Sequence, residues 1–545
     1  MDQEVLKVVF AKNRFDKNDS DIIRGKYVRH GDKVLDNPAY AISGYMDVAD
    51  APLNACLKTN IGGIRFICFY DNDKKYITCL ENTNPAPIPH NAAYARLSFN
   101  HINMDHLEVH VCAQPKQNMT FVNDICLPST LWLLSDTQND LFVQPFLKRW
   151  RPYDDFVRFS LDKNAPFMRR FSMVASIDNP VDGTVLTTEL VNGDEFAIVK
   201  RLQTTIRVGE KSVGNKSVTA QILGDSYVHG AFFRHALLDS GYVPNLQLVG
   251  LLKCAEKQYN EGRGGWSLNS YFNIPTKPVQ CYHGYMQPDG NVRYWGATRF
   301  WTTAWQCFRK TAPKGFEPYY SCGRFDDVLP RFDESTGFLR NPQKGDLQYD
   351  NDKQSFVLYD GAAWQPAVKE QFNWNIDYSK YLSMWDIQKP DFLFVMLGLN
   401  DFRNNLQADF TEWGRRIAVF KESYLKANPD GKFVICIPCS TCGSLDNVAG
   451  DFTVRQNAAM WRFRKWLIDT FDQKEKDGYY LLDVGLAIDN DYGFMLAKNA
   501  STIPFESYKG EESLRIQSGN PHPYPNYPSM GIPIAAFIQY YRDRK

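Results

Sequence analysis

The chain has 545 residues, which is enough for about three to five domains at roughly 100–200 residues each. Hydrophobic residues make up 44% and charged residues 23%, a composition typical of globular proteins and not of disordered chains. Because 62 Lys and Arg balance 62 Asp and Glu, neither nucleic-acid binding nor attraction to an anionic membrane is expected. No apolar run approaches the ~18 residues that a membrane span needs, and residues 1–4 are too acidic for a Sec signal, so neither membrane insertion nor Sec export is expected.

Residues 1–125 consist of short apolar or alternating runs separated by Asn, Asp and Gly, a pattern that predicts an all-β sandwich. Within it, the stretch Ile64–Leu80, with the run RFICFYDNDKKYI, and the later run NAAYARLSFN resemble the jelly-roll, carbohydrate-binding-type modules of bacteriophage tail fibres and bacterial surface proteins. Residues 126–215 contain further β-like runs with Gly and Asn-Pro turns, and we expect a β-rich connector domain there.

From residue 216 to 545 strands alternate with amphipathic helices. The strands are predicted at 218–223, 246–252, 392–397, 433–437 and 479–484, and the helices at 227–240, 406–426, 455–471 and 532–541. Five strands joined by helices predict a five-stranded parallel sheet in an α/β/α, flavodoxin-like domain. In such a sheet ligands bind beside the carboxyl ends of the strands.

Two local clusters have ordinary structural interpretations. Cys436, Cys439 and Cys442 have no fourth Cys or His at zinc-ligand spacing, so reduced cysteines are favoured over a metal. Seven of the 12 tryptophans lie from Trp266 to Trp385, and six of them belong to an aromatic-rich insertion (residues 267–385) that either packs as a core or forms a wall over a glycan. Trp295 and Trp301 are the stacking candidates on the second interpretation.

Four short motifs follow predicted strands or precede the last helix. Gly224-Asp225-Ser226 ends the first strand, EGRGGW (261–266) comes after the second, Asn400 follows the third, and His522 lies just before the final helix. These motifs, in this order, resemble the SGNH (GDSL) hydrolase family of esterases and lipases.

The resemblance implies a role for each motif. Ser226 is the nucleophile, His522 is the general base, and Gly265 and Asn400 donate to the oxyanion. These residue types suit acyl transfer, because an alkoxide needs a base and the tetrahedral intermediate needs donors. From position alone, Arg263, Trp266 and His229 are candidates for contacting the substrate.

One position departs from the family pattern. The family usually has an aspartate three residues before the histidine, and Gly519 stands there. Asn520 could accept a hydrogen bond from the imidazole instead, a backbone carbonyl could orient the ring, or Asp483, Asp489 or Asp491 could substitute.

These observations predict a serine esterase that removes O-acyl groups, in the first place O-acetyl, from a carbohydrate without a metal or organic cofactor. The combination with a lectin-like module resembles a bacteriophage receptor-binding or tail-fibre component acting on bacterial surface or capsular polysaccharide. That setting implies a virion or extracellular location, and homotrimers or other virion proteins as partners, while a cytoplasmic enzyme stays open. The alternative is a degenerate hydrolase fold in a structural or adhesive virion protein that only binds glycan, which Gly519 favours.

Overall fold

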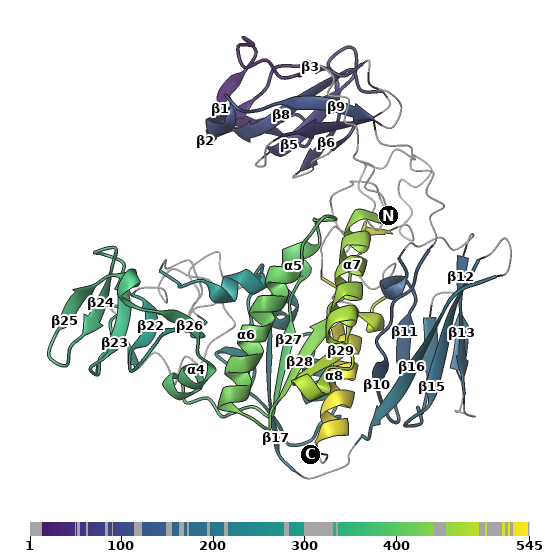
Figure 1. Cartoon of the computed structure of the whole chain (residues 1–545), viewed down its shortest axis with the longest axis vertical. Helices are drawn as coiled ribbons and strands as arrows, with labels where there is room; N and C mark the ends of the chain where they lie inside the picture. The colour runs from purple at the N-terminus through teal and green to yellow at the C-terminus, as the bar shows by residue number, and fades with distance from the viewer. Residues whose placement is uncertain are drawn as a thin grey trace. The chain divides into compact units, whose positions relative to one another are not determined.

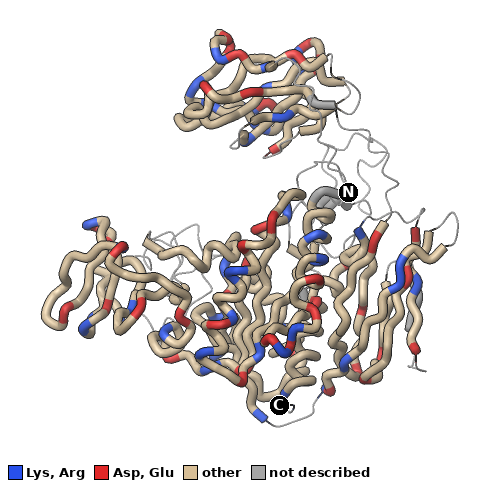
Figure 2. The backbone as a smooth tube through the Cα atoms, viewed as in Figure 1, with Lys and Arg blue, Asp and Glu red and all other residues tan. Residues whose placement is uncertain are grey.

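A computed structural model gives the structure of the chain (Figure 1). It describes residues 13–49, 51, 55–60, 64–81, 86–89, 91–113, 123–148, 155–162, 168–171, 174–192, 197–211, 216–276, 283–298, 331–333, 336–440, 454–489, 496–498, 515–517, 522–523, 527–542 and 544. Two compact units share the chain, Met1–Val122 and Asn123–Lys545. Acidic and basic residues are interspersed along both (Figure 2), and none of the described helices is long and apolar enough to cross a membrane.

The first unit consists of two sheets that share one apolar core. The larger sheet has the order β1-β2-β8-β5-β6, with β3 beside β8, and the smaller has the order β7-β4-β9. Their strands are β1 (Ile23–Arg29), β2 (Lys33–Ile42), β3 (Met46–Asp47), β4 (Ala55–Thr59), β5 (Ile64–Tyr70), β6 (Tyr76–Glu81), β7 (Ala86–Pro87), β8 (Tyr94–Asn100) and β9 (Val109–Ala113). The core draws on both sheets because alternate residues of each strand, such as Leu57, Ile67 and Leu97, point between them.

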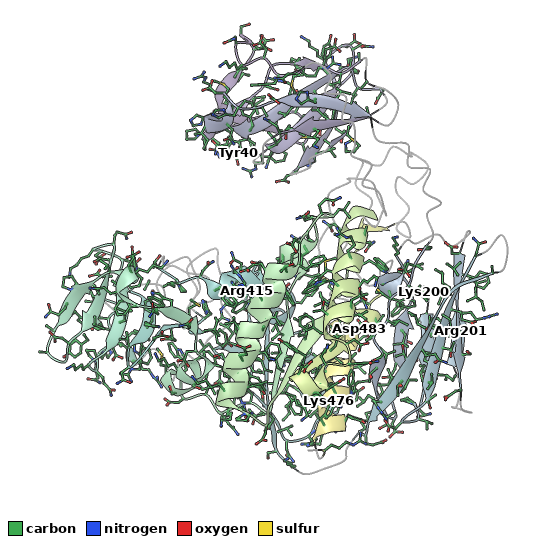
Figure 3. The ribbon with its side chains drawn as sticks, viewed as in Figure 1. Tyr40, Lys200, Arg201, Arg415, Lys476 and Asp483 are labelled. Atoms are coloured by element: carbon green, nitrogen blue, oxygen red, sulfur yellow. A yellow bond between two sulfur atoms is a disulfide. The ribbon has the colours of Figure 1, made fainter. Side chains whose placement is uncertain are left out.

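The other face of the larger sheet is aromatic, where an exposed face would ordinarily be polar. Tyr45 packs against Tyr70 and Tyr94, and the guanidinium of Arg65 lies over Tyr27 and Tyr40 (Tyr40 is labelled in Figure 3). A disulfide between Cys68 and Cys79 joins β5 to β6 on this face.

The second unit begins with two small sheets, of order β10-β16-β15-β12 and β11-β14-β13. Their strands are β10 (Thr130–Leu134), β11 (Asn139–Phe142), β12 (Asp155–Leu161), β13 (Met168–Phe171), β14 (Val174–Ile177), β15 (Val185–Asn192) and β16 (Ile198–Gly209). The β-rich segment therefore lies in the same compact unit as everything that follows it.

The central sheet of the second unit has the order β19-β20-β17-β27-β28-β29, with β18 also paired to β17. These strands are β17 (Val218–Gly224), β18 (Leu246–Leu248), β19 (Leu252–Ala255), β20 (Gln258–Gly262), β27 (Phe392–Met396), β28 (Lys432–Ile437) and β29 (Tyr479–Asp483). β17 is parallel to β18, β20 and β27, and β27, β28 and β29 are parallel in turn.

The predicted flavodoxin-like domain with a five-stranded parallel sheet is wrong. The sheet has seven strands and is mixed, because β19 runs antiparallel to β20, and it stands among several other sheets in a strand-rich chain. The polar run Lys253–Tyr259 hid this hairpin from sequence reasoning. In the turn of the hairpin, Lys257 has a positive φ of 54°. A non-glycine residue rarely adopts this conformation, so the sequence did not predict a turn there.

The predicted helix over residues 227–240 is also interrupted. Only α1 (Ser226–His229) and a π-helical turn η3 (His235–Asp239) form, with Ala231 at a φ of 52° between them. Gly241 follows at a φ of 70°, a conformation typical of a glycine that ends a helix.

The remaining helices are α4 (Tyr378–Met384), α5 (Leu399–Phe402), α6 (Thr411–Ala427), α7 (Val454–Phe471) and α8 (Tyr527–Tyr541). α8 is packed between two sheets, because the ring of Phe537 lies 5.0 Å from that of Trp132 on β10 and 5.8 Å from that of Phe394 on β27. α8 can approach β16 closely because residue 209 is a glycine. A Cβ on Gly209 would lie 2.2 Å from the carbonyl oxygen of Ala536 on α8.

The insertion forms small sheets beside α4 and α6 (Figure 1). Its strands are β21 (Met286–Pro288), β22 (Arg293–Ala297), β23 (Asp346–Asp350), β24 (Ser355–Tyr359), β25 (Trp364–Ala367) and β26 (Trp374–Ile376), and a further pair, β30 (Leu496–Lys498) and β31 (Arg515–Gln517), precedes α8.

Candidate active site

Three of the sequence motifs lie at one edge of the central sheet. Ser226 follows β17, Gly265 follows β20 and Asn400 follows β27. Because β17 is parallel to both β20 and β27, the carboxyl ends of these strands share one edge. The sheet thus brings together residues that are up to 174 positions apart in sequence (from 226 to 400).

The turn that carries Ser226 is held by close backbone packing. The Asp225 side chain accepts a hydrogen bond from the Tyr227 N–H at 3.0 Å and so caps α1. A Cβ on Gly224 would lie 2.4 Å from Cγ2 of Val228, and one on Gly262 would lie 2.1 Å from the backbone nitrogen of His229. Both glycines are therefore required for β17, β20 and α1 to meet, and Ser226 itself is only partly buried.

The segment after β20 lies directly beside this turn. The N–H of Arg263 donates to the carbonyl of Gly224 at 3.0 Å. Gly265 is exposed and adopts a φ of 77°, with nothing within 4 Å of a Cβ placed there. Its conformation, and not crowding, is what calls for glycine at this position.

Asn400 joins the two loops. Its side-chain N–H donates to the carbonyl oxygen of Trp266 at 3.0 Å and lies 3.5 Å from Oδ2 of Asp225. One amide is thus next to the residue that follows Gly265 and to the residue that precedes Ser226. The two expected oxyanion donors, Gly265 and Asn400, therefore lie near each other and near the turn that carries Ser226.

His522 lies beside the turn that carries Ser226. Its ring centroid is 5.6 Å from that of Tyr227, in an edge-to-face arrangement, so positions 522 and 227 are close although they are 295 residues apart. Burial and the positive charges of Arg403 and His229 lower the pKa of His522 to about 4. The imidazole is therefore neutral at pH 7, as a general base has to be.

Two acidic groups beside the site have raised pKa values, so each keeps its proton to a higher pH than an exposed carboxyl does. Burial, and the neighbouring Asp401, raise the pKa of Asp225 to about 7. Burial raises the pKa of Asp401 to about 6, although its carboxylate accepts from the Leu268 N–H.

Four of the sequence candidates for orienting the histidine divide between described and undescribed residues. Gly519, Asn520 and Asp491 lie outside the described residues. Asp483, at the end of β29 (labelled in Figure 3), is buried and forms an ion pair with Arg464.

The residues predicted to contact substrate lie at different depths. Arg263 is fully buried and pairs with Glu261 at 2.5 Å, so its side chain holds the loop from behind. Trp266 is half-buried against Tyr271, and His229 is half-buried on α1. Trp295 is buried in the insertion, and its indole N–H donates to Asp346 at 2.8 Å. Trp301 lies outside the described residues.

Sequence reasoning missed the buried polar network behind the loop. Glu261 accepts from the Leu251 N–H at 2.6 Å and from the Tyr381 hydroxyl, while the Tyr271 hydroxyl lies 2.7 Å from both the Gly224 and Glu261 carbonyls. The sequence contained one signal of this network, because Glu261 stands two positions before Arg263 in a Gly-rich run and could pair with it. Its partners on α4 could not be read from the sequence, because they come from 120 residues away.

Among the described residues, no group of three or more His, Cys, Asp or Glu side chains is arranged to hold a metal ion. Cys436 and Cys439 are buried free thiols, and burial raises the pKa of both.

No protein-family model matches the chain, and no curated protein matches it. Distant neighbours among solved structures include a possible lipase from Chitinophaga pinensis, at 11% identity and a TM-score of 0.27 over 59% of this chain and 98% of that one. A family two carbohydrate esterase from Cellvibrio japonicus is 10% identical over 96% of this chain and 97% of its own, with a TM-score of 0.20. A carbohydrate acetylesterase from Xanthomonas citri is 12% identical over 77% and 76%, with a TM-score of 0.19.

At these scores the neighbours do not assign an activity to the chain, which has to come from the site residues. The neighbours named above give no support to the tail-fibre resemblance.

Proposed function

We propose that the second unit is a serine esterase that removes O-acyl groups, in the first place O-acetyl, from a carbohydrate. The observation that carries the proposal is the convergence of Ser226, Gly265, Asn400 and His522 around one turn, through the contacts of Asp225, Trp266 and Tyr227. A hydroxyl, a neutral imidazole and amide donors are the groups that acyl transfer needs.

The proposed reaction assigns one step to each of these groups. The Ser226 hydroxyl attacks the ester carbonyl while His522 takes its proton, and the carbonyl oxygen gains the negative charge. The Asn400 side-chain N–H and the backbone N–H groups of Gly265 and Ser226 stabilise that oxyanion. His522 then gives the proton to the leaving sugar hydroxyl, and water, activated by the same imidazole, releases the acid from Ser226.

The charge state of Asp225 supports this assignment. A carboxylate next to the oxyanion would oppose its formation. Because burial raises its pKa to about 7, Asp225 is largely uncharged below that pH.

The carbohydrate part of the proposal is supported by the aromatic face of the first unit. Tyrosine rings next to guanidinium and ammonium groups are surfaces on which sugar rings stack and hydrogen-bond. The expected virion setting and its partners rest on resemblance alone and stay a prediction.

The test compares the full-length wild type with Ser226→Ala on p-nitrophenyl acetate and on an acetylated polysaccharide. We expect the variant to lose at least about 10³-fold in kcat on both substrates. Equal rates for the two proteins would refute the proposal. Binding of the polysaccharide without hydrolysis by the wild type would favour the adhesive alternative.

A further inference from the structure

The insertion contains a polar groove that is separate from the residues of the candidate active site. Its volume is about 360 Å³, at the lower end of the ~300–1,000 Å³ of small-molecule sites. Its floor is Trp295, Met384 and Leu339, all of which are buried. Asn341, Gln343, Ser383 and Asp386 form its exposed rim.

Two guanidinium groups in the wall are fixed by carboxylates. Arg293 donates to Asp346 at 2.8 Å and to the side chain of Gln343 at 3.0 Å, and Asp346 also accepts from the backbone N–H of Gln343 at 2.7 Å. Arg331 pairs with Asp386 and donates to the carbonyl of Met384. The side chains of Arg293 and Arg331 remain 31% and 29% exposed, so N–H donors beyond those pairs face the groove.

These pairs determine the chemistry that the groove can bind. Each cation is balanced by a carboxylate, so an anionic ligand would gain little net charge attraction. A guanidinium next to a carboxylate offers donors and acceptors side by side, which is what the neighbouring hydroxyls of a sugar ring require. An apolar floor beneath a polar rim fits the two surfaces of a sugar ring.

From this geometry we infer that the groove between β22, β23 and α4 is a binding subsite for a neutral oligosaccharide. The subsite is mechanically joined to the candidate active site. Met384 and Asp386 flank the end of α4, and on the same helix the Tyr381 hydroxyl bonds to Glu261, the partner of Arg263 behind the oxyanion loop. A glycan held here would be bound to the same compact unit as Ser226.

Binding is tested on the full chain carrying Ser226→Ala, so that no substrate is consumed. Calorimetric titrations use hexasaccharides of β-1,4-linked glucose, xylose and mannose, with a hexamer of galacturonic acid as the anionic probe. The groove variant combines Gln343→Ala with Asp386→Ala, both exposed positions. The matched control is Gln365→Ala, an exposed amide on β25 of the same insertion.

We expect at least one neutral hexasaccharide to bind, the double variant to raise its Kd at least tenfold, and Gln365→Ala to leave Kd unchanged. Because Asp386→Ala leaves Arg331 without its carboxylate, binding of the galacturonic acid hexamer should strengthen in the double variant. Absence of binding to all three neutral hexasaccharides, or a Kd that the double variant does not change, would overturn the inference.

The same variants in an active Ser226 background separate this inference from the proposed function. Hydrolysis of p-nitrophenyl acetate, which has no sugar for the groove to bind, should be the same in wild type and double variant. An inactive wild type that still binds hexasaccharide through the groove would refute the esterase and leave the subsite standing.

Discussion

The two halves of the candidate site are built in different ways. The nucleophile and oxyanion half follows three parallel strands, and it is fixed by close packing at Gly224 and Gly262 and by the side-chain amide of Asn400. His522 comes from a segment between β31 and α8, outside the central sheet, and meets the first half through the ring of Tyr227. The sheet therefore determines where the oxyanion forms, whereas side-chain packing determines where the base stands.

The strongest test of this difference is Gly262→Ala. A Cβ there would lie 2.1 Å from the His229 nitrogen and 2.4 Å from the Val228 carbonyl carbon, so β20 and α1 have to separate. We expect a loss of unfolding free energy of about 1–3 kcal/mol, measured by urea denaturation, together with loss of esterase activity.

Gly241→Ala is the control for Gly262→Ala. Gly241 has a φ of 70° with nothing within 4 Å of a Cβ, so only its backbone strain would change, at a cost of about 1 kcal/mol without an effect on activity. Equal activities in the two variants would show that the nucleophile turn does not depend on this close packing.

Asn400→Ala removes an oxyanion donor without removing a packed apolar group. We expect kcat on p-nitrophenyl acetate to fall by about 10²–10³-fold with little change in thermal stability. Gln407 is an exposed amide a few residues after α5, the helix that contains Asn400, and Gln407→Ala should have no effect on kcat. A fall in kcat below tenfold for Asn400→Ala would remove this residue from the oxyanion half.

Asp225→Asn tests the charge state beside the nucleophile. Since the folded-state pKa is about 7 and the ordinary value is 3.8, the folded protein binds more protons than the unfolded chain between these pH values. The unfolding free energy of the wild type, relative to the variant, should therefore fall as pH rises from about 4 to 7, by at most roughly 1.4 kcal/mol per pH unit.

Asp409→Asn gives the opposite pattern as a control. Hydrogen bonds from Thr411 lower the pKa of Asp409, so its contribution is present above the ordinary pKa and is lost as pH falls through the lower folded-state value. A relative stability of Asp225→Asn that does not change between pH 4 and 7 would mean that Asp225 is ionised in the folded protein.

The sequence predicted β17 and β27, which precede Ser226 and Asn400, to within a residue or two, but not β20, which precedes Gly265. Buried parallel strands are continuous apolar runs, as in Phe392–Met396, and Gly-rich turns at their ends are visible in the sequence. The mixed character of the sheet was missed because β19 and β20 form a short polar hairpin whose pairing depends on tertiary contacts.

The contacts of the site residues could be predicted only in part. Ser226 and Asn400 follow strands, so topology places them, but the burial of Arg263 depends on Glu261 and on Tyr271, whose positions are set by the insertion. Arg403 was missed for a similar reason. An arginine three residues after Asn400 looks like a surface residue until the segment carrying His522 is placed beside it.

The smallest expected effect concerns the histidine half and uses Arg403→Met. Protonated imidazole cannot act as the base, so kcat/KM of the wild type should fall below about pH 4, the pKa of His522. Because the positive charge of Arg403 disfavours the imidazolium, its removal should raise that pKa and move the acidic limb of the profile to higher pH, with little change in the rate at pH 7. Arg415→Met, which removes an exposed ion pair with Glu412 on α6 (labelled in Figure 3), should leave the limb in place. An acidic limb that stays unchanged in Arg403→Met would mean either that another group is the base or that Arg403 lies too far from His522. His522→Ala distinguishes the two: this variant is inactive only if His522 is the base.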